Sequence, residues 1–309
     1  MLESTIPQTD IPQTKAPTRA TSLADMAERM YTVFNADGEE AWRAFQPRPS
    51  DVIISPYGKS GTTWLQQIVH GLRTGGDMDF DDISRVVPWI ETSYALGIDL
   101  NAEQRGHPRA FKSHLAWDDV PKGGRYIVSI RDPKDAFVSR YHFMQGWLVV
   151  PGSIPMSEWA NDNFARDRQK SGYWRHLLSW WEHRQDENVL LLCYETMKTD
   201  LPGTIRRVAQ FIGVALDDRL FDTVLRQSSF DFMLAHKDKF DERLMSERME
   251  KVAGLPPGGD STKVRKGKVG EHVYELSDEI IAQFDQAWRE EIEAKLGFAS
   301  YAALRSAIR

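Results

Sequence analysis

A lysine lies in a short glycine-containing segment, SPYGKSGTTW, at residues 55–64. The apolar run before it predicts a strand and the periodic run after it a helix, and backbone N–H groups at the start of a helix bind anions. Lys59 adds a mobile positive charge, and three side chains add hydroxyl donors: Ser60, Thr62 and Thr63. The segment therefore predicts a phosphate site, although a strand–helix turn with an exposed lysine is the simpler alternative.

The nearest general motif is the phosphate loop of nucleotide triphosphatases, G-x-x-x-x-G-K-[ST]. Gly58, Lys59 and Ser60 match the end of this motif. Its first glycine would fall at position 53, which is Ile53, so the motif is incomplete. An ATP-dependent small-molecule kinase is therefore an alternative function, and it would require Mg²⁺.

Two further basic segments could bind a second anionic group. Arg131 follows the apolar run YIVSI, and Ser139 lies about two helical turns later. A guanidinium can form paired hydrogen bonds with a phosphate, and a serine adds one more donor. The segment KVRKGKVG has glycines that would let it wrap around an anion, and its cations are Lys263, Arg265, Lys266 and Lys268. Either segment alone could equally be a solvated charged face.

One of the eight histidines stands beside a lysine in an extended segment. In RAFKSH, side chains alternate along the chain, so Lys112 and His114 face the same side. An imidazole, whose ordinary pKa lies near neutrality, can accept a proton from a hydroxyl, and the lysine can stabilise developing negative charge. A lone histidine is more often structural, so the residue pattern alone leaves the role of His114 open.

Charge and composition narrow the class of protein. The formal net charge of −6 argues against a general nucleic-acid binder, which needs a basic face. The single cysteine, Cys193, lies in an apolar run and predicts a buried, unreactive thiol. No run of ~18 apolar residues is present, so no membrane span is expected. Residues 1–20 read as a disordered tail and not as a signal peptide, and we expect a cytoplasmic protein.

The residues with chemical potential follow predicted strands. Apolar strands at 51–55, 125–130 and 189–193 alternate with helices, and further helices are expected at 201–212 and 278–296. This order predicts an α/β domain over residues 21–309, with a parallel sheet, helices on both faces and ligands beyond the strand ends. Asp132 and Asp135 predict a capping box. Residues 235–268 are charged with little periodicity, and are expected to form a long mobile lid.

Taken together, six segments resemble the cytosolic sulfotransferases: GKSGTTW, PRAFKSHL, IRDPKDAFVSRYHF, SWWEHRQDENVLLLCYETMK, SSFDFM and RKGKVG. They occur in the order and approximate spacing of that family, from about residue 40 to 295. The resemblance implies a single P-loop-like α/β domain that uses 3′-phosphoadenosine 5′-phosphosulfate (PAPS) and no metal. The product would be adenosine 3′,5′-bisphosphate (PAP). Within the family the chain resembles aryl and alcohol sulfotransferases, which implies a phenolic or lipophilic alcohol acceptor.

The resemblance also assigns roles around the donor. The 5′-phosphosulfate loop would be Lys59, Ser60, Gly61, Thr62 and Thr63, with Trp64 near the adenine. The 3′-phosphate would be held by Arg131, Ser139, Arg265, Lys266 and Gly267. The adenine side would be contacted by Tyr194, Ser228 and Phe230.

Catalytic and acceptor roles follow from the same resemblance. His114 would be the general base, Lys59 would stabilise the leaving oxygen and Lys112 the sulfuryl oxygens. Ser139 would engage Lys59 before the acceptor binds. Trp89 and Phe143 match acceptor-pocket positions; three more residues are candidates by sequence only and could as well belong to the core: Met144, Trp147 and Phe240.

The sequence departs from the family at two places. Gly58 stands where a proline commonly precedes the loop lysine, and EHVYELSDE lacks the Asp-Trp-Lys stretch in which many relatives carry a dimerisation motif. The familiar homodimer is therefore in doubt, whereas a small-molecule acceptor remains the expected partner. A nucleotide-binding scaffold without catalysis is the non-enzyme alternative, but it would be expected to lose Lys59 or His114, and both are present.

Overall fold

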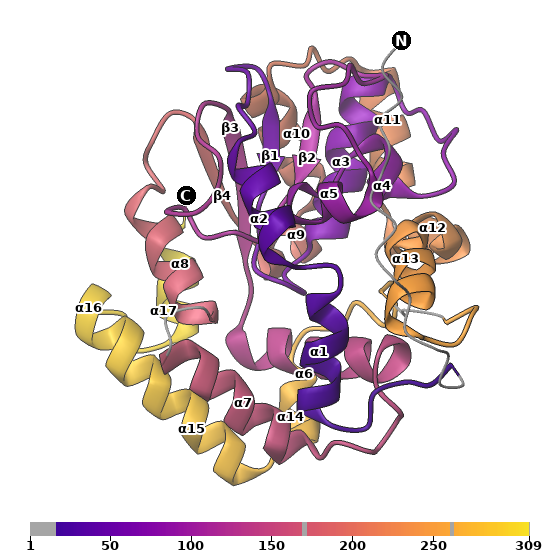
Figure 1. The fold of residues 1–309 in the computed structure, drawn as a ribbon. Coiled ribbons are helices and arrows are strands. Elements are labelled where there is room, and N and C mark those ends of the chain that lie inside the picture. The colour runs from indigo at the N-terminus through magenta and orange to yellow at the C-terminus, as the bar shows by residue number, and fades with distance from the viewer. Residues whose placement is uncertain (1–16, 169–171, 260–262, 309) are drawn as a thin grey trace.

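The computed structural model describes residues 17–168, 172–259 and 263–308 and places four parallel strands in one sheet (Figure 1). Three strands were predicted, and the extended segment that carries Lys112 pairs with them as the fourth. The strand order is β2-β1-β3-β4. Their bounds are β1 Val52–Ile54, β2 Ala110–Lys112, β3 Arg125–Ile130 and β4 Val189–Cys193.

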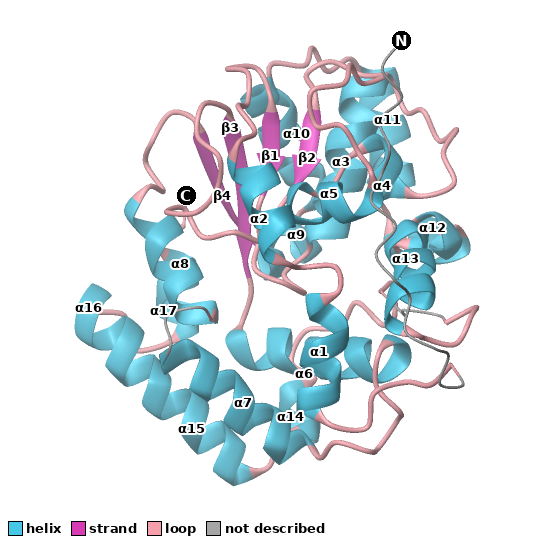
Figure 2. Ribbon diagram, in the orientation of Figure 1, coloured by secondary structure: helices cyan, strands magenta, loops and turns pink. Residues whose placement is uncertain are grey.

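Helices cover both faces of the sheet, as predicted (Figure 2). Apolar strand residues alternate between the faces, with Ile53 on one side and Ile54 on the other. Ile54 packs with residues of α3 (Thr62–Thr74), α10 and α11; Ile53 packs with residues of α2, α6 and α8. Because both faces are buried, the strands consist almost entirely of apolar residues.

Several helix ends carry residue types that favour capping. Ser22 caps α1 and Asp132 caps α6, while Gly75 and Gly213 end α3 and α10 with a positive φ. The helices are α1 Leu23–Tyr31, α2 Ala36–Arg43, α3 Thr62–Thr74, α4 Ile83–Val86, α5 Ser93–Leu96, α6 Pro133–Trp147, α7 Met156–Arg168, α8 Tyr173–Glu182, α9 Tyr194–Thr199, α10 Leu201–Ile212, α11 Asp218–Gln227, α12 Phe230–Ala235, α13 Arg243–Ala253, α14 His272–Glu275, α15 Asp278–Trp288, α16 Ala294–Leu296 and α17 Tyr301–Ser306. The helix expected at 278–296 contains a π-helical turn, Arg289–Glu293, between α15 and α16.

The predicted capping box is wrong at its second residue. The Asp135 carboxylate is buried and accepts hydrogen bonds from the backbone N–H groups of Gly270 and His272 and from the His272 ring. A carboxylate that binds these donors is unavailable to the N-terminus of its own helix. Asp135 instead fastens the end of the basic segment, residues 263–270, to α6.

The segment 235–268 is also more regular than its sequence indicated. It contains α13, and Phe240, Met245 and Met249 are buried in the core. The Leu244 N–H donates to the Asp82 carboxylate at 2.9 Å, which attaches the start of α13 to the segment before α4. The expected loop is therefore anchored over its first half, and residues 260–262 lie outside the described part.

The described residues include only the end of the expected N-terminal tail, residues 17–20. Residues 1–16 of the expected tail lie outside the described residues. Ala20, at the end of that tail, is buried and exchanges backbone hydrogen bonds with Leu148 and Val150, so order begins before Ser22. None of the helices in the described ranges is long and apolar enough to cross a membrane.

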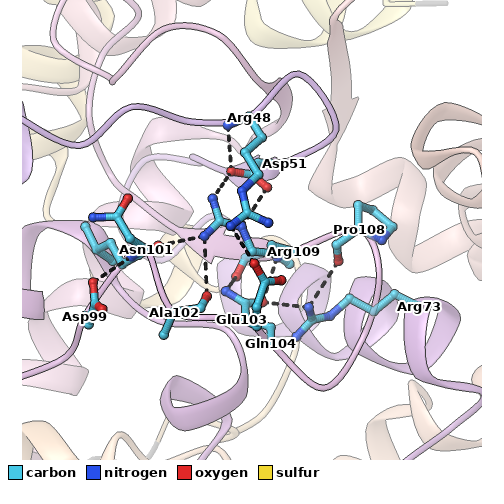
Figure 3. Close-up of polar contacts among 12 residues, drawn as sticks. Arg48, Asp51, Arg73, Asp99, Asn101, Ala102, Glu103, Gln104, Pro108 and Arg109 are labelled. Atoms are coloured by element: carbon cyan, nitrogen blue, oxygen red, sulfur yellow. Dashed lines mark hydrogen bonds and ion pairs between the residues drawn. The ribbon is translucent and has the colours of Figure 1, made fainter.

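A polar network holds the start of β2 against β1 (Figure 3). Arg109 donates to both oxygens of Asp51, at 3.0 and 2.5 Å, and both side chains are buried. Arg73, on α3, donates to the backbone carbonyls of Gly106 and Pro108. Losing one partner of a buried ion pair costs about 3–5 kcal/mol, so this network fixes the strand that carries Lys112.

Candidate active site

A cavity of about 740 Å³ lies where the parallel strands end. Residues directly after each strand line it: Tyr57–Lys59 after β1, Lys112 and His114 at the end of β2, Arg131 after β3, and Tyr194 after β4. This edge is where open α/β sheets bind their ligands. The sheet thus brings together residues from four distant parts of the sequence.

The loop between β1 and α3 has an unusual backbone that its neighbours support. Lys59 has a φ of 68° and Gly61 a φ of 98°. A side chain on Gly61 would meet the Tyr194 ring at 3.1 Å, so only glycine fits there without displacing that ring. Ser129, on β3, donates to the Ser60 carbonyl, and Arg131 donates to the Lys59 carbonyl at 2.9 Å. The loop is therefore fixed by β3 before any ligand binds.

Arg131 joins this loop to the basic segment. Its guanidinium also donates to the Lys268 carbonyl at 3.2 Å and stacks over the Tyr194 ring at 4.4 Å. The Tyr173 hydroxyl donates to the Arg131 carbonyl at 2.6 Å, which holds its backbone. Arg131 is 5% exposed, so its charge acts in a region of low dielectric.

Several polar atoms around this loop are buried without a hydrogen-bond partner among the described residues: Ser60 Oγ, Thr62 Oγ1, Ser228 Oγ and Arg131 Nε. Such groups are costly unless a ligand or water satisfies them. Together with the nearby cations, they fit an anionic ligand with many acceptor oxygens. Within the described ranges, no group of three or more His, Cys, Asp or Glu is placed to hold a metal ion.

Three aromatic rings lie beside these cations and unpaired polar atoms. Trp64 donates to the Ser228 carbonyl at 2.7 Å and meets Tyr194 edge-on, with ring centroids 5.9 Å apart. Phe230 lies against Gly267, whose φ is 57° and where an added Cβ would come within 3.0 Å of the ring. These three rings line the cavity and offer faces and edges to a planar group.

The Lys59 ammonium points to the other end of the cavity. It lies over the Phe143 ring, 4.4 Å from the centroid. Burial above all, together with the charges of Lys263, Arg131 and Arg265, lowers the Lys59 pKa to about 7. Ser139 also lines the cavity, but no hydrogen bond joins it to Lys59 among the described residues.

Lys112 and His114 both pack against Trp89. The Lys112 ammonium is 3.7 Å from the Trp89 ring centroid, and the His114 ring meets the same indole edge-on at 5.2 Å. The Lys112 N–H donates to the Pro88 carbonyl, which holds Trp89 beside β2. The alternation expected in RAFKSH is therefore confirmed.

The hydrogen bonds of His114 decide its tautomer. Its Nδ1 is 2.8 Å from the Pro56 carbonyl, which can only accept, so Nδ1 carries the proton and Nε2 a lone pair. Its backbone N–H donates to Glu91 at 2.7 Å. Burial and, to a lesser extent, Lys112 hold the His114 pKa well below its ordinary value, so the ring is neutral at physiological pH. A neutral imidazole with an available Nε2 can accept a proton.

Similarity to known proteins settles the family. A sulfotransferase domain matches residues 49–295 of the chain. The chain belongs to the sulfotransferase family. Luciferin sulfotransferase of Photinus pyralis is 30% identical over 285 residues, covering 80% of this chain and 73% of that protein. Amine sulfotransferase of Oryctolagus cuniculus is 28% identical over 259 residues, covering 81% and 83%.

Solved structures show the same fold. Mouse sulfotransferase SULT7A1, complexed with PAP, matches with a TM-score of 0.66 and 22% identity, covering 89% of this chain and 95% of that chain. Retinol dehydratase in a complex with retinol and PAP matches with a TM-score of 0.64 and 19% identity, covering 89% and 96%. The P-loop-like α/β fold expected from the sequence is confirmed.

The sulfotransferase cavity is lined by all but one of the predicted site residues. The exception is Ser60, which is fully buried in the loop. Met144 and Trp147, which the sequence left between pocket and core, line the cavity. Phe240 belongs to the core, where it packs against Phe80 with ring centroids 6.4 Å apart.

Other cavity residues were not predicted. Met30 comes from α1, and Phe34 comes from the turn that follows it and meets Trp89 edge-on at 5.3 Å. Arg140 and Glu242 add charges to the wall, beside Lys263 of the predicted basic segment. No local pattern marked Glu242.

Proposed function

We propose that this sulfotransferase moves a sulfuryl group from PAPS to the hydroxyl of a phenol or lipophilic alcohol by in-line displacement. The observation that carries the proposal is that one cavity joins a cationic, glycine-containing half to an aromatic half, with Lys112 and His114 against Trp89. Two structural relatives were solved with PAP, the product of this donor, which supports the choice of donor.

When bound, PAPS supplies an activated sulfuryl group on a phosphate oxygen. The loop of Lys59–Thr63 would bind the 5′ side, since its backbone is preformed and its buried hydroxyls lack partners. Arg131 and Ser139, with residues 265–267, would bind the 3′-phosphate. The adenine would lie among Trp64, Tyr194 and Phe230, with Ser228 beside it.

His114 is proposed as the general base. Its Nε2 takes the acceptor proton as the acceptor oxygen bonds to sulfur, and the bond from sulfur to the phosphate oxygen breaks with its electron pair on the phosphate. Lys59 stabilises that oxygen and Lys112 the sulfuryl oxygens. The bond from Nδ1 to Pro56 keeps the ring in the tautomer that this step needs.

The acceptor would occupy the aromatic half of the cavity. Its wall combines Trp89 with Phe143 and Trp147 of α6, with Met30 of α1 and with Phe34 just after that helix. Flat, apolar walls favour a ring-containing or lipophilic alcohol. A relative that acts on luciferin is consistent with a ring-containing acceptor.

Thermal shift with three nucleotides tests the donor class. A ligand specific for the folded state stabilises it by mass action, about 2.7 kcal/mol at a concentration of 100 Kd. PAP should raise the melting temperature without Mg²⁺ and at lower concentration than AMP or ATP. A larger shift with ATP and Mg²⁺ would favour the kinase alternative. Stabilisation by PAP without transfer from PAPS to a phenol series would instead favour a non-catalytic scaffold.

A further inference from the structure

Glu242 and Lys263 are charged residues of the cavity wall that have no role in the mechanism so far. The Glu242 carboxylate forms ion pairs through Oε1 with Lys112, at the end of β2, and with Lys263, at the start of the basic segment. The three side chains are 7%, 2% and 9% exposed respectively. One carboxylate thus bridges a proposed catalytic lysine and the segment proposed to bind the donor.

The backbone around Glu242 is arranged to place it there. Glu242 has a φ of 54°, one of two positive values at non-glycine residues in the described ranges; the other is at Lys59. Such a conformation persists only where its surroundings enforce it. Here Phe240 is buried on one side and the Leu244 N–H is bound to Asp82 on the other. Glu242 is therefore held between two core anchors and not on a free loop.

This bridge supplies negative charge to a cavity wall in which cations outnumber acidic residues. Glu242 and Glu271 are the acidic residues among the described cavity walls, and Glu271 is paired with Arg265 and Lys266 on the basic segment. Without Glu242, the two buried lysines would lose the carboxylate that both contact, and the remaining acidic neighbours, such as Asp82, act on them only by longer-range Coulomb attraction. Burial lowers the Lys263 pKa to about 7 and holds the Lys112 pKa well below its ordinary value, so each ammonium group relies on a nearby carboxylate to keep its proton.

We propose that Glu242 is a positioning residue for sulfuryl transfer, which holds Lys112 as an ammonium group beside His114 and ties it to the basic segment through Lys263. This inference rests on the proposed function, because it takes Lys112 to act on the sulfuryl oxygens. Glu242 itself touches neither donor nor acceptor in this role. Its effect passes through Lys112, so it should appear in turnover more than in binding.

The test compares Glu242→Gln with Glu247→Gln. Glu247 lies on α13, close in sequence, is half-exposed and pairs with Arg243 at 2.7 Å, so the same substitution there removes a charge away from the cavity. With wild-type kcat as reference, Glu242→Gln should lower kcat by ~10- to 100-fold, less than the ~10²–10³-fold loss expected when an electrostatic stabiliser itself is removed. The acceptor KM and the Kd for PAP should change less than about 3-fold, and Glu247→Gln should match the wild type.

A double variant shows whether Glu242 acts through its charge or only supports the structure. In Glu242→Gln, the two lysines repel each other; adding Lys263→Gln removes that repulsion and should restore part of the lost kcat. No recovery, or a parallel loss of kcat, PAP binding and melting temperature in Glu242→Gln, would overturn the positioning role. An unchanged kcat in Glu242→Gln, with an active wild type, would overturn the inference alone. An inactive wild type would overturn the proposed function, and the inference with it.

Discussion

At the scale of residues, the proposed chemistry depends on a histidine whose two ring nitrogens have different surroundings. Nδ1 of His114 is bonded to a backbone carbonyl, while Nε2 belongs to a ring that lines the cavity. Trp89 packs against the same ring and against Lys112, so the spacing of base and cation is set by one indole. Substitutions of these residues should therefore affect different parts of the reaction.

Replacing His114 by alanine should lower turnover by at least ~10²-fold, the usual contribution of a general base. PAP binding should stay near the wild-type level, because the proposed phosphate contacts lie on other segments. An acidic nitrophenol should recover part of the loss, since its hydroxyl needs less help to lose its proton. The measurement is kcat across a series of substituted phenols at saturating donor.

Lys59→Ala is the contrast for that series. The leaving oxygen would lack its counter-charge whatever the acidity of the acceptor, so acidic phenols should rescue this variant poorly. If His114→Ala retained near wild-type turnover with an unactivated alcohol, the base would lie elsewhere.

At the scale of elements, the sequence predicted best what is local. Each strand–turn–helix unit carries its own signals, as in the run from β3 through Asp132 to α6, and these units were correct. The anion loop was visible for the same reason, because its glycines and lysine are contiguous. These residues needed no knowledge of the tertiary structure.

Features that depend on long-range packing were missed. Met245, Met249 and Val252 follow helical spacing in α13, but the charges between them concealed the pattern. The Asp135 carboxylate, predicted to complete the capping box, instead accepts hydrogen bonds from Gly270 and His272, far along the chain. Glu242 is near Lys112 only because Phe240 and Leu244 anchor its segment on the residues before α4. No local rule contains such contacts.

We therefore expect the mobile part of the lid to lie in the second half of the segment 235–268. Amides of α13 should be protected from hydrogen exchange without ligand, because Met245 and Met249 are buried. Amides of residues 263–268 should exchange faster in the free protein and slow by at least ~10-fold with PAP, once the donor engages Arg265–Gly267. Hydrogen-exchange mass spectrometry measures both regions at once, with α13 as internal control. Equal exchange at 263–268 with and without PAP would contradict the prediction that this segment closes over the donor.

At the scale of the whole molecule, a protein with a net charge of −6 is proposed to bind a polyanion. Charges on its surface are screened over a Debye length of about 8 Å at physiological ionic strength. Binding of the polyanion therefore depends on the local cluster of cations. That cluster comprises Lys59 and Lys263, with Arg131 and Arg265, at one cavity. Burial and the neighbouring positive charges lower the pKa of Lys59, so nucleotide binding should depend on pH.

PAP binding should therefore be accompanied by proton uptake. The pKa of Lys59 lies near 7 in the free protein, so above pH 7 this lysine is largely neutral. A bound phosphate favours the ammonium form and raises this pKa, so a proton is taken up between about pH 7 and 10. The affinity for PAP should fall as the pH rises through this range, and change little below pH 6, where Lys59 already carries its proton. Calorimetry at pH 8 in buffers of different ionisation enthalpy measures the uptake directly, because the observed heat then depends on the buffer. A heat independent of the buffer at pH 8 would mean that Lys59 is charged before the nucleotide arrives, and Lys59→Met, which removes the titrating group, should remove this uptake.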